Sequence, residues 1–516
     1  MSKLAVGIYD DLDNQTQPVL KVDLTSENMI VFGGHSSGKT TFIKTLLVRL
    51  HEQIDTDKES SVYILDFGGN LGQYKSLPNV AACFDNSNEE NVRRVFKTVE
   101  AKLEKNSKLL TSRRFIEVWE SGEEKELCHM VLIIDNLNSF FADERYEPYQ
   151  DTLTKFCRDG LSKGLSLVFT VSELGGVSRL LGSFGSRFAL DGSADKYMDI
   201  FGMRISEPMK NPGRGITVIG GKPREFQFFL PFMDEKRDLP MFTQSLSEIK
   251  TKTEKLTAFE GDLTEENFFE YLSGSFGEET GTDRPVVGLD YYDHMPVTVN
   301  MQEAHAIAIY GKKKFGKSNL LTVLIRFIRK NHPDYRIVFF DDGRKQLEEL
   351  YREQPQGSFY FTSMEQMYEF LDSYGYAAKM ERGVINREFT EKQNPGTVFV
   401  LQNKMLFQSA GSQLLKNVFP RMTAAAEEKK YWFIYSDVRK ISNNDRDTES
   451  SLNNSIAVAF LLDNIAEFVA DRGSRSVFGE MDPKELKTEY ARCELGDGYY
   501  YDIEADELKK IKFIKA

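Results

Sequence analysis

The fold is decided by the stretch Gly33-Gly34-His35-Ser36-Ser37-Gly38-Lys39-Thr40. An apolar run at 29–32 precedes it and a helix-like run at 42–50 follows it, so we expect a strand, a glycine-rich loop and a helix in that order. Glycines allow such a loop to turn consecutive N–H groups inward, where they and the helix N-terminus favour an anion. In this spacing Lys39 reaches the β- and γ-phosphates of a nucleotide, and the Thr40 hydroxyl ligates Mg²⁺.

The same spacing recurs in the second half of the chain, at Gly311-Lys312-Lys313-Lys314-Phe315-Gly316-Lys317-Ser318. A strand-like run at 304–310 precedes it and a helix-like run at 320–328 follows it. Two matches in matching contexts favour nucleotide sites over lysine-rich surface loops. We therefore predict two ATP-binding loops, each extended by the next residue of its helix, Thr41 or Asn319.

The composition is that of a globular cytosolic protein. The chain has 516 residues, of which 41% are hydrophobic and 28% charged, with a net charge of −13. This acidic balance gives no sign of a global grip on nucleic acid. The four cysteines lack metal or disulfide spacing, which fits a reducing compartment. No apolar run reaches about 18 residues, the length needed to cross a membrane, and no signal peptide is recognisable.

A long internal repeat divides the chain. The two loops begin at 33 and 311, and a Val-Gly pair precedes each at a similar distance, at 6 and 287. This indicates two copies of one domain. We expect the first domain at 1–245, a linker at 246–285 and a degenerate second domain at 286–516. Within the linker, 246–256 is charged and helix-like, and 272–285 is rich in glycine and serine.

Both copies alternate strand-like and helix-like runs, which predicts an α/β fold with a mostly parallel sheet flanked by helices. The strand-like runs of the first copy are 29–32, 61–67, 130–134 and 165–171, and those of the second are 304–310, 336–340, 397–401 and 432–435. Late in the first copy, 215–221 and 225–230 read as a hairpin. In such sheets ligands bind at the carboxyl ends of the strands, where both loops are expected.

The catalytic half of the first site is degraded. The apolar run 131–134 is followed by Asp135, which is placed to support Mg²⁺. Thr40 and Ser318 are predicted to support Mg²⁺ from the two loops. Asn136 stands where a glutamate would polarise the attacking water, and a missing general base typically costs about 10²–10⁴ in rate. Asp143 or Glu144 remains a possible substitute.

In the second copy, Gln402 and Asn403 follow the corresponding strand, so both carboxylates are gone. Two other runs there reach an acid, 337–342 and 434–437. We align the first run with 62–66 of the first copy. We align the second with 170–173, so that Ser436 corresponds to Ser172. Gln402 then remains at the degraded position. We therefore assign no catalytic residue to either copy.

At this point the sequence resembles the tandem C-terminal ATPase domains of the type VII secretion motor of the EssC/YukB type, in the FtsK/SpoIIIE family. The resemblance covers essentially the whole chain. It is carried by the segments 6–11, 33–41, 65–69, 211–215 and 287–293.

The resemblance implies two tandem P-loop domains of RecA/FtsK type that use ATP and Mg²⁺. It implies a C-terminal fragment of a membrane-anchored, hexameric motor on the cytoplasmic side of the bacterial membrane, soluble by itself. Its partners would be small helical secreted proteins of the Trp-x-Gly type, other domains of the motor and membrane components of the machine, with no nucleic acid. Two departures, at 160–164 and 169–172, where the family's donated arginine and its strand-end glutamine are missing, put turnover in doubt.

Three hypotheses follow. The first is an ATP-binding, weakly hydrolysing or non-hydrolysing module that helps recognise and export secreted proteins. The second is an active DNA translocase, which a salt-dependent affinity for DNA would support. The third is a docking scaffold with one or both sites empty, which tight nucleotide binding would exclude for the first copy.

Overall fold

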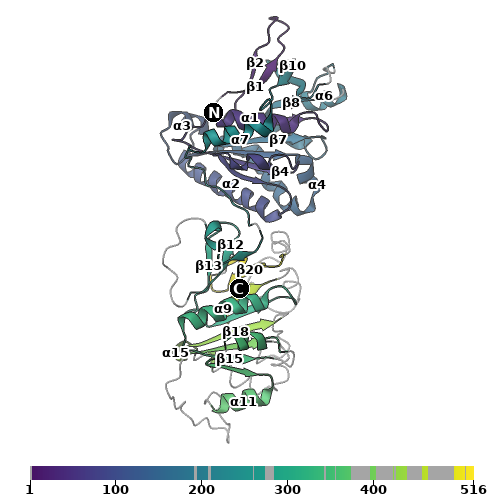
Figure 1. The fold of residues 1–516 in the computed structure, drawn as a ribbon. Helices are drawn as coiled ribbons and strands as arrows, with labels where there is room; N and C mark the ends of the chain where they lie inside the picture. The colour runs from purple at the N-terminus through teal and green to yellow at the C-terminus, as the bar shows by residue number, and fades with distance from the viewer. Residues whose placement is uncertain are drawn as a thin grey trace. The chain divides into compact units, whose positions relative to one another are not determined.

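The structure, a computed structural model, divides into two compact units, Met1–Ala258 and Phe259–Ala516 (Figure 1). It describes residues 3–190, 194–206, 211–259, 261–272, 284–341, 345–354, 356–373, 396–402, 422–423, 426–437, 456–462, 493–505 and 507–516. The expected linker, 246–285, includes the division between the units, and its residues 273–283 lie outside this described part.

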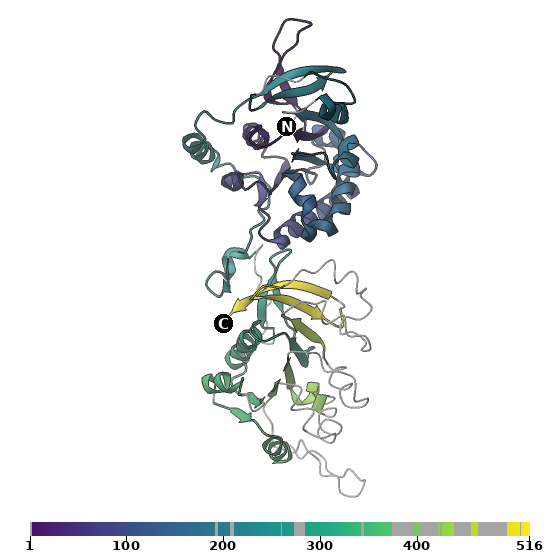
Figure 2. The same ribbon diagram turned by 90° about the vertical axis from the view of Figure 1, so that its right-hand side faces the viewer.

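A sheet of ten described strands forms the centre of the first unit, in the order β2-β1-β10-β9-β8-β3-β7-β6-β4-β5. The strands are β1 (Leu4–Tyr9), β2 (Val19–Val22), β3 (Asn28–Phe32), β4 (Glu59–Asp66), β5 (Val80–Phe84), β6 (Cys128–Asp135), β7 (Leu165–Val171), β8 (Phe184–Ala189), β9 (Arg214–Ile219) and β10 (Lys222–Phe228). The strands from β8 to β5 in this order pair in parallel, whereas β2, β1, β10 and β9 extend the sheet with antiparallel pairs. The loop between β1 and β2 projects beyond the sheet (Figures 1 and 2).

Helices cover both faces of this sheet. They are α1 (Lys39–His51), α2 (Glu89–Leu110), α3 (Phe115–Ser121), α4 (Leu137–Ala142), α5 (Gln150–Lys155), α6 (Ala194–Phe201) and α7 (Glu235–Leu246). Alternate residues of the parallel strands enter two cores: Leu132 and Ile134 pack in the core that contains α2 and α4, whereas Val131 and Ile133 pack in the core that contains α1 and α7. Burial on both faces explains why these strands read as continuous apolar runs. The predicted α/β fold is confirmed.

The predicted hairpin is confirmed as β9 and β10. Ile219 pairs with Lys222, so the turn consists of Gly220 and Gly221. Both glycines have positive φ, 59° and 77°. A two-residue turn of this kind matches the twist of the strands, and side chains at both positions would be strained.

The expected helix at 246–256 is wrong. Helix α7 ends at Leu246, and the chain then runs without helix along the sheet. Its polar groups bond to backbone carbonyls near β5, the last strand: Lys255 Nζ donates to Val80 O at 2.7 Å, and Leu256 N to Ala81 O at 2.7 Å. These tertiary hydrogen bonds override the weak helix propensity of the segment.

The second unit repeats the same architecture. Its main path runs β13-β12-β21-β20-β19-β14-β18-β17-β15-β16, which matches the first unit position by position. The strands are β11 (Leu263–Thr264), β12 (Val286–Asp290), β13 (Pro296–Thr298), β14 (Ala306–Tyr310), β15 (Arg336–Phe340), β16 (Ser358–Phe361), β17 (Thr397–Gln402), β18 (Tyr431–Asp437), β19 (Val458–Leu461), β20 (Asp497–Asp502) and β21 (Glu507–Lys515). The described helices are α8 (Phe268–Tyr271), α9 (Lys317–Asn331), α10 (Glu348–Glu353), α11 (Met364–Ser373) and α15 (Ala426–Lys429).

The repeated Val-Gly pair has a packing reason. A Cβ atom on Gly7 would lie 2.3 Å from Gln227 O, and one on Gly288 would lie 2.2 Å from Lys512 O. The backbones of β10 and β21 thus approach these glycines of β1 and β12 too closely for a side chain to fit without a shift. Among the described residues, no helix is long and apolar enough to cross a membrane.

Candidate nucleotide sites

The first candidate loop connects β3 to α1, as the sequence predicted. Ser36 and Gly38 have positive φ, 58° and 108°, so the loop turns sharply before the helix begins at Lys39. Gly38 is the N-cap residue, and no side chain caps the helix. A helix N-terminus without a side-chain cap favours an anion.

Lys39 folds back over this loop. Its Nζ atom donates to Gly33 O at 2.6 Å and to Gly34 O at 2.7 Å. Ser37 Oγ donates to the same Gly34 carbonyl at 3.0 Å, whereas His35 is exposed. The ammonium group thus lies at the mouth of the loop, where phosphate oxygens would sit.

Asp135 joins the loop from the carboxyl end of β6. Thr40 Oγ1 donates to Asp135 Oδ2 at 2.9 Å, and Thr170 Oγ1, on β7, donates to Asp135 Oδ1 at 2.5 Å. Asp135 is 2% exposed. Burial raises the pKa of its carboxyl group, and the hydrogen bonds from Thr170 and Thr40 oppose that rise. The two residues predicted to support Mg²⁺ in the first copy are therefore in direct contact.

Asn136 faces its own helix. The residue has φ 66° and precedes α4, its Nδ2 atom donates to Ser139 Oγ at 2.6 Å, and its backbone N–H donates to Thr170 Oγ1 at 2.8 Å. An amide in this position cannot take a proton from water at neutral pH.

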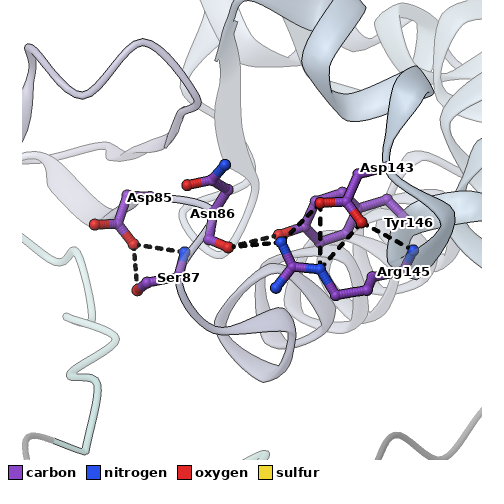
Figure 3. Close-up of polar contacts among 6 residues, drawn as sticks. All are labelled: Asp85, Asn86, Ser87, Asp143, Arg145 and Tyr146. Atoms are coloured by element: carbon purple, nitrogen blue, oxygen red, sulfur yellow. Dashed lines mark hydrogen bonds and ion pairs between the residues drawn. The ribbon is translucent and has the colours of Figure 1, made fainter.

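Asp143, the suggested substitute base, is paired with Arg145. Its carboxylate accepts from Arg145 Nη2 at 2.7 Å and from the Arg145 backbone N–H at 3.1 Å, and Arg145 Nη2 also donates to Asn86 O at 3.0 Å (Figure 3). The hydrogen bonds from Arg145 hold the pKa of Asp143 below its usual range. A lowered pKa makes this carboxylate a weaker base.

The turn at 212–215 forms a second wall of the loop. Gly213 N donates to Ser37 O at 2.7 Å, and a Cβ atom on Gly38 would lie 2.7 Å from Gly213 N. Arg214 beside it donates to Glu225 at 2.6 Å and to Asp10 at 3.2 Å. The segments 6–11, 33–41 and 211–215, which carry the family resemblance, thus meet at one end of the first unit.

The second candidate loop has the same backbone but a different surface. Lys314 and Gly316 have positive φ, 69° and 97°, and Lys317 Nζ donates to Gly311 O at 2.5 Å and to Lys312 O at 3.0 Å. The consecutive lysines 312–314 are exposed, and Phe315 packs against the core of the unit. Ser318, the counterpart of Thr40, is also exposed.

Asn319, the last predicted contact of this loop, bonds to the end of the chain. Its Nδ2 atom donates to Ile514 O at 2.7 Å, and its Oδ1 atom accepts from Ala516 N at 2.8 Å. Any contact from Asn319 to a nucleotide would therefore involve its backbone.

Strand register shows that Gln402 in the second unit occupies the position that Asp135 occupies in the first. Gln402 pairs with Ser436 on β18, and Ser436 lies beside β14 where Thr170 lies beside β3. The sequence-based match of Ser436 to Ser172 is therefore wrong by two residues, because the apolar runs offered no fixed point for alignment. Gln402 Nε2 donates to Gln346 Oε1 at 2.5 Å, whereas its Oε1 atom has no hydrogen-bond partner among the described residues. Asn403 lies outside those residues.

The sequence analysis assigned no role at the site to two residues that lie near it. Thr170 contacts Asp135 from the neighbouring strand, and Asp66 ends β4 directly beside Asp135. A polar residue at the end of an apolar strand was the available signal for both, but only the strand order shows that these ends adjoin.

Comparison with known proteins agrees with this geometry. Residues 9–173 match the FtsK/SpoIIIE family. The ESX-3 secretion system protein EccC3 of Mycobacterium tuberculosis is 25% identical over 331 residues, which cover 60% of this chain and 24% of that protein. The type VII secretion system protein EssC of Staphylococcus aureus is 24% identical over 195 residues, which cover 36% of this chain and 13% of that protein. The chain thus spans about a quarter of the first relative and less of the second.

Two solved structures share the fold of the whole chain. EssC (ATPases 2 and 3) of Geobacillus thermodenitrificans matches with a TM-score of 0.69 and 18% identity, covering 100% of this chain and 96% of that one. Thermomonospora curvata EccC (ATPases 2 and 3), in complex with a signal sequence peptide, matches with a TM-score of 0.61 and 18% identity, covering 100% and 93%. The resemblance recognised in the sequence is confirmed. The chain carries an FtsK/SpoIIIE family domain and is a homologue of the EccC and EssC proteins of type VII secretion systems.

Proposed function

We propose that the chain is an ATP-binding module of a type VII secretion motor, with ATP and Mg²⁺ bound by the first unit and with weak or no hydrolysis. One observation carries the proposal. Lys39 and Thr40 open α1 at an uncapped helix N-terminus, and the Thr40 hydroxyl contacts the buried carboxylate of Asp135 at 2.9 Å. This arrangement supports a phosphate cradle and a cation anchor at one loop.

The residues present suit the nucleotide. Lys39 would exchange its contacts with the Gly33 and Gly34 carbonyls for phosphate oxygens, which are stronger acceptors because they are charged. Thr40 and Asp135 would hold the ion and its water shell, and bound Mg²⁺ supplies positive charge at the phosphates. In the second unit Lys317 and Ser318 remain, but Gln402 brings no charge to the ion. There we propose phosphate binding that depends less on Mg²⁺.

Weak hydrolysis is supported by the groups around Asp135. The side chain of Asn136 bonds to Ser139, and that of Asp143 bonds to Arg145. An amide is no general base, and the pairing with Arg145 makes the Asp143 carboxylate a weaker base. Loss of a general base typically costs about 10²–10⁴ in rate, so bound ATP would be hydrolysed slowly.

A role in export rests on the relatives. The solved structure of Thermomonospora curvata EccC contains a signal sequence peptide. We propose that this chain likewise contacts small helical secreted proteins, as part of a hexameric, membrane-anchored motor on the cytoplasmic side of the membrane. Bound nucleotide would influence that contact through its different affinity for two states of the chain.

The test measures ATP affinity and single-turnover hydrolysis on the full chain, with Lys39→Ala and Lys317→Ala as a matched pair. We expect Lys39→Ala to weaken Mg²⁺-dependent ATP binding about 10- to 100-fold, because a charged hydrogen bond contributes about 1.5–3 kcal/mol. Lys317→Ala should leave this component intact. Absence of ATP binding by the unaltered chain would overturn the proposal. Turnover at about 1–100 per second, typical of phosphoryl-transfer enzymes, would refute weak hydrolysis.

A further inference from the structure

A second buried carboxylate lies beside Asp135. Asp66 ends β4, and it pairs directly with Asp135 across the parallel β4–β6 ladder. Asp66 is 4% exposed. Its Oδ2 atom accepts from Leu71 N at 2.6 Å, whereas its buried Oδ1 atom has no hydrogen-bond partner among the described residues. A buried carboxylate oxygen without a partner is costly, so this atom calls for a ligand.

Gly68 keeps open the space between the two carboxylates. A Cβ atom on Gly68 would lie 2.7 Å from Asp135 Oδ2 and 3.7 Å from Asp66 Oδ1. The φ of Gly68 is not positive, in contrast to that of Gly69 at 71°, so the backbone alone does not require glycine at 68. The open space borders Asp135 Oδ2, the atom that Thr40 contacts. The unpartnered oxygen of Asp66 is therefore directed towards the cation side of Asp135.

In the second unit, where Gln402 takes the place of Asp135, the carboxylate that corresponds to Asp66 has an additional side-chain donor. Asp341 ends β15 at the position of Asp66, and its Oδ2 atom accepts from Leu347 N at 2.7 Å and from Tyr360 OH at 2.9 Å. Strand register places Cys83 at the position of Tyr360 in the first unit. The first unit thus lacks this additional donor to the carboxylate oxygen that also accepts from a backbone N–H, and the other oxygen of Asp66, Oδ1, has no hydrogen-bond partner within the described residues.

We propose that Asp66 Oδ1 is a further acceptor for the water shell of the Mg²⁺ ion that enters the first site with ATP. The inference rests on the proposed function and adds a second carboxylate to the cation site of Thr40 and Asp135. Mg²⁺ keeps several of its waters when it binds a protein, and carboxylate oxygens are suited to receive their hydrogen bonds. Asp66 is thus a positioning residue, which raises the affinity of the loaded site for the ion.

The test measures nucleotide affinity of the full chain against Mg²⁺ concentration and in EDTA, together with Mn²⁺ binding by electron paramagnetic resonance in the presence of ADP. Asp66→Asn should raise the half-maximal metal concentration about 10- to 100-fold, the usual effect of removing an outer-shell partner. Nucleotide affinity in EDTA should be unchanged. Asp341→Asn is the matched control and should not alter the metal dependence of the first site.

Because Asp66 also holds Leu71 N, a second variant separates metal binding from loop structure. Gly68→Ala fills the space between the carboxylates without strain at a positive φ and should reproduce the metal defect, whereas Gly72→Ala has nothing within 4 Å of its added Cβ atom and should not. Unchanged metal dependence in Asp66→Asn, or an equal loss of affinity in EDTA, would overturn the inference alone. Absence of nucleotide binding by the unaltered chain would overturn the proposed function as well.

Discussion

Thr170→Val should destabilise the first unit because its hydroxyl satisfies two buried groups at once. Thr170 is fully buried, donates to Asp135 Oδ1 at 2.5 Å and accepts from Asn136 N at 2.8 Å. Valine has nearly the same shape, so the change removes the hydrogen bonds without opening a cavity. Each buried group left without a partner costs about 1–3 kcal/mol, and we expect the free energy of unfolding to fall by about 2–4 kcal/mol.

The two tryptophans of the chain allow this loss to be measured in one unit. Trp119 lies in the first unit and Trp432 in the second, and both are buried. In a Trp432→Phe background, the fluorescence of Trp119 during urea unfolding reports on the first unit alone. The midpoint and slope of that transition give the free energy of unfolding, provided that the slope is unchanged by Thr170→Val.

The matched control is Thr217→Val. Thr217 is also buried, but it donates to a neutral acceptor, Arg187 O, at 2.8 Å, so its loss should cost about 0.5–1.5 kcal/mol. The cost of Thr170→Val should also shrink at low pH, because protonation of Asp135 removes the charge that the hydroxyl stabilises. A loss no larger than that of Thr217→Val, or one independent of pH, would refute the reasoning.

Two further predictions concern the frame of the first unit. Gly215→Ala places a Cβ atom 2.2 Å from Ala189 O and should cost about 2 kcal/mol or more in the Trp119 assay, whereas Gly182→Ala enters open space and should stay within about 0.5 kcal/mol. Burial lowers the pKa of both His51 and His129 to about 4, so the unfolded chain, with a pKa near 6.5, takes up the protons first. Stability should therefore be lost as pH falls from 6.5 towards 4, by up to about 3 kcal/mol for each histidine, and His129→Gln should flatten this dependence. An equally steep dependence in that variant would count against the assignment.

Local patterns were read correctly from the sequence, whereas contacts between strands were not. The loop at 33–40 was predictable because its spacing and its flanking runs are consecutive in the chain. Asp135 was predictable because an acid after a buried strand must lie at the sheet edge. Thr170 was not, because its importance depends on β7 lying next to β6. The segment 246–256 was misread for the same reason, since its partners are carbonyls of a strand far away in sequence.

The two units share one loop geometry but differ at the end of the strand beside the loop. Both retain the turned loop and a lysine that bonds back to the first carbonyl of that loop. At the end of the neighbouring strand, however, Asp135 in the first unit is replaced by Gln402 in the second. An amide in that position needs no counter-charge, and Asp341 beside it accepts from a tyrosine hydroxyl, whereas Asp66 Oδ1 has no hydrogen-bond partner within the described part of the chain. The two units thus differ at the ends of two adjacent strands, β6 and β4 in the first unit and β17 and β15 in the second. Because we propose that Asp135 holds Mg²⁺ in the first unit, Asp135→Gln should make the metal dependence of nucleotide binding at the first site resemble that of the second, although the loop at 33–40 is unchanged.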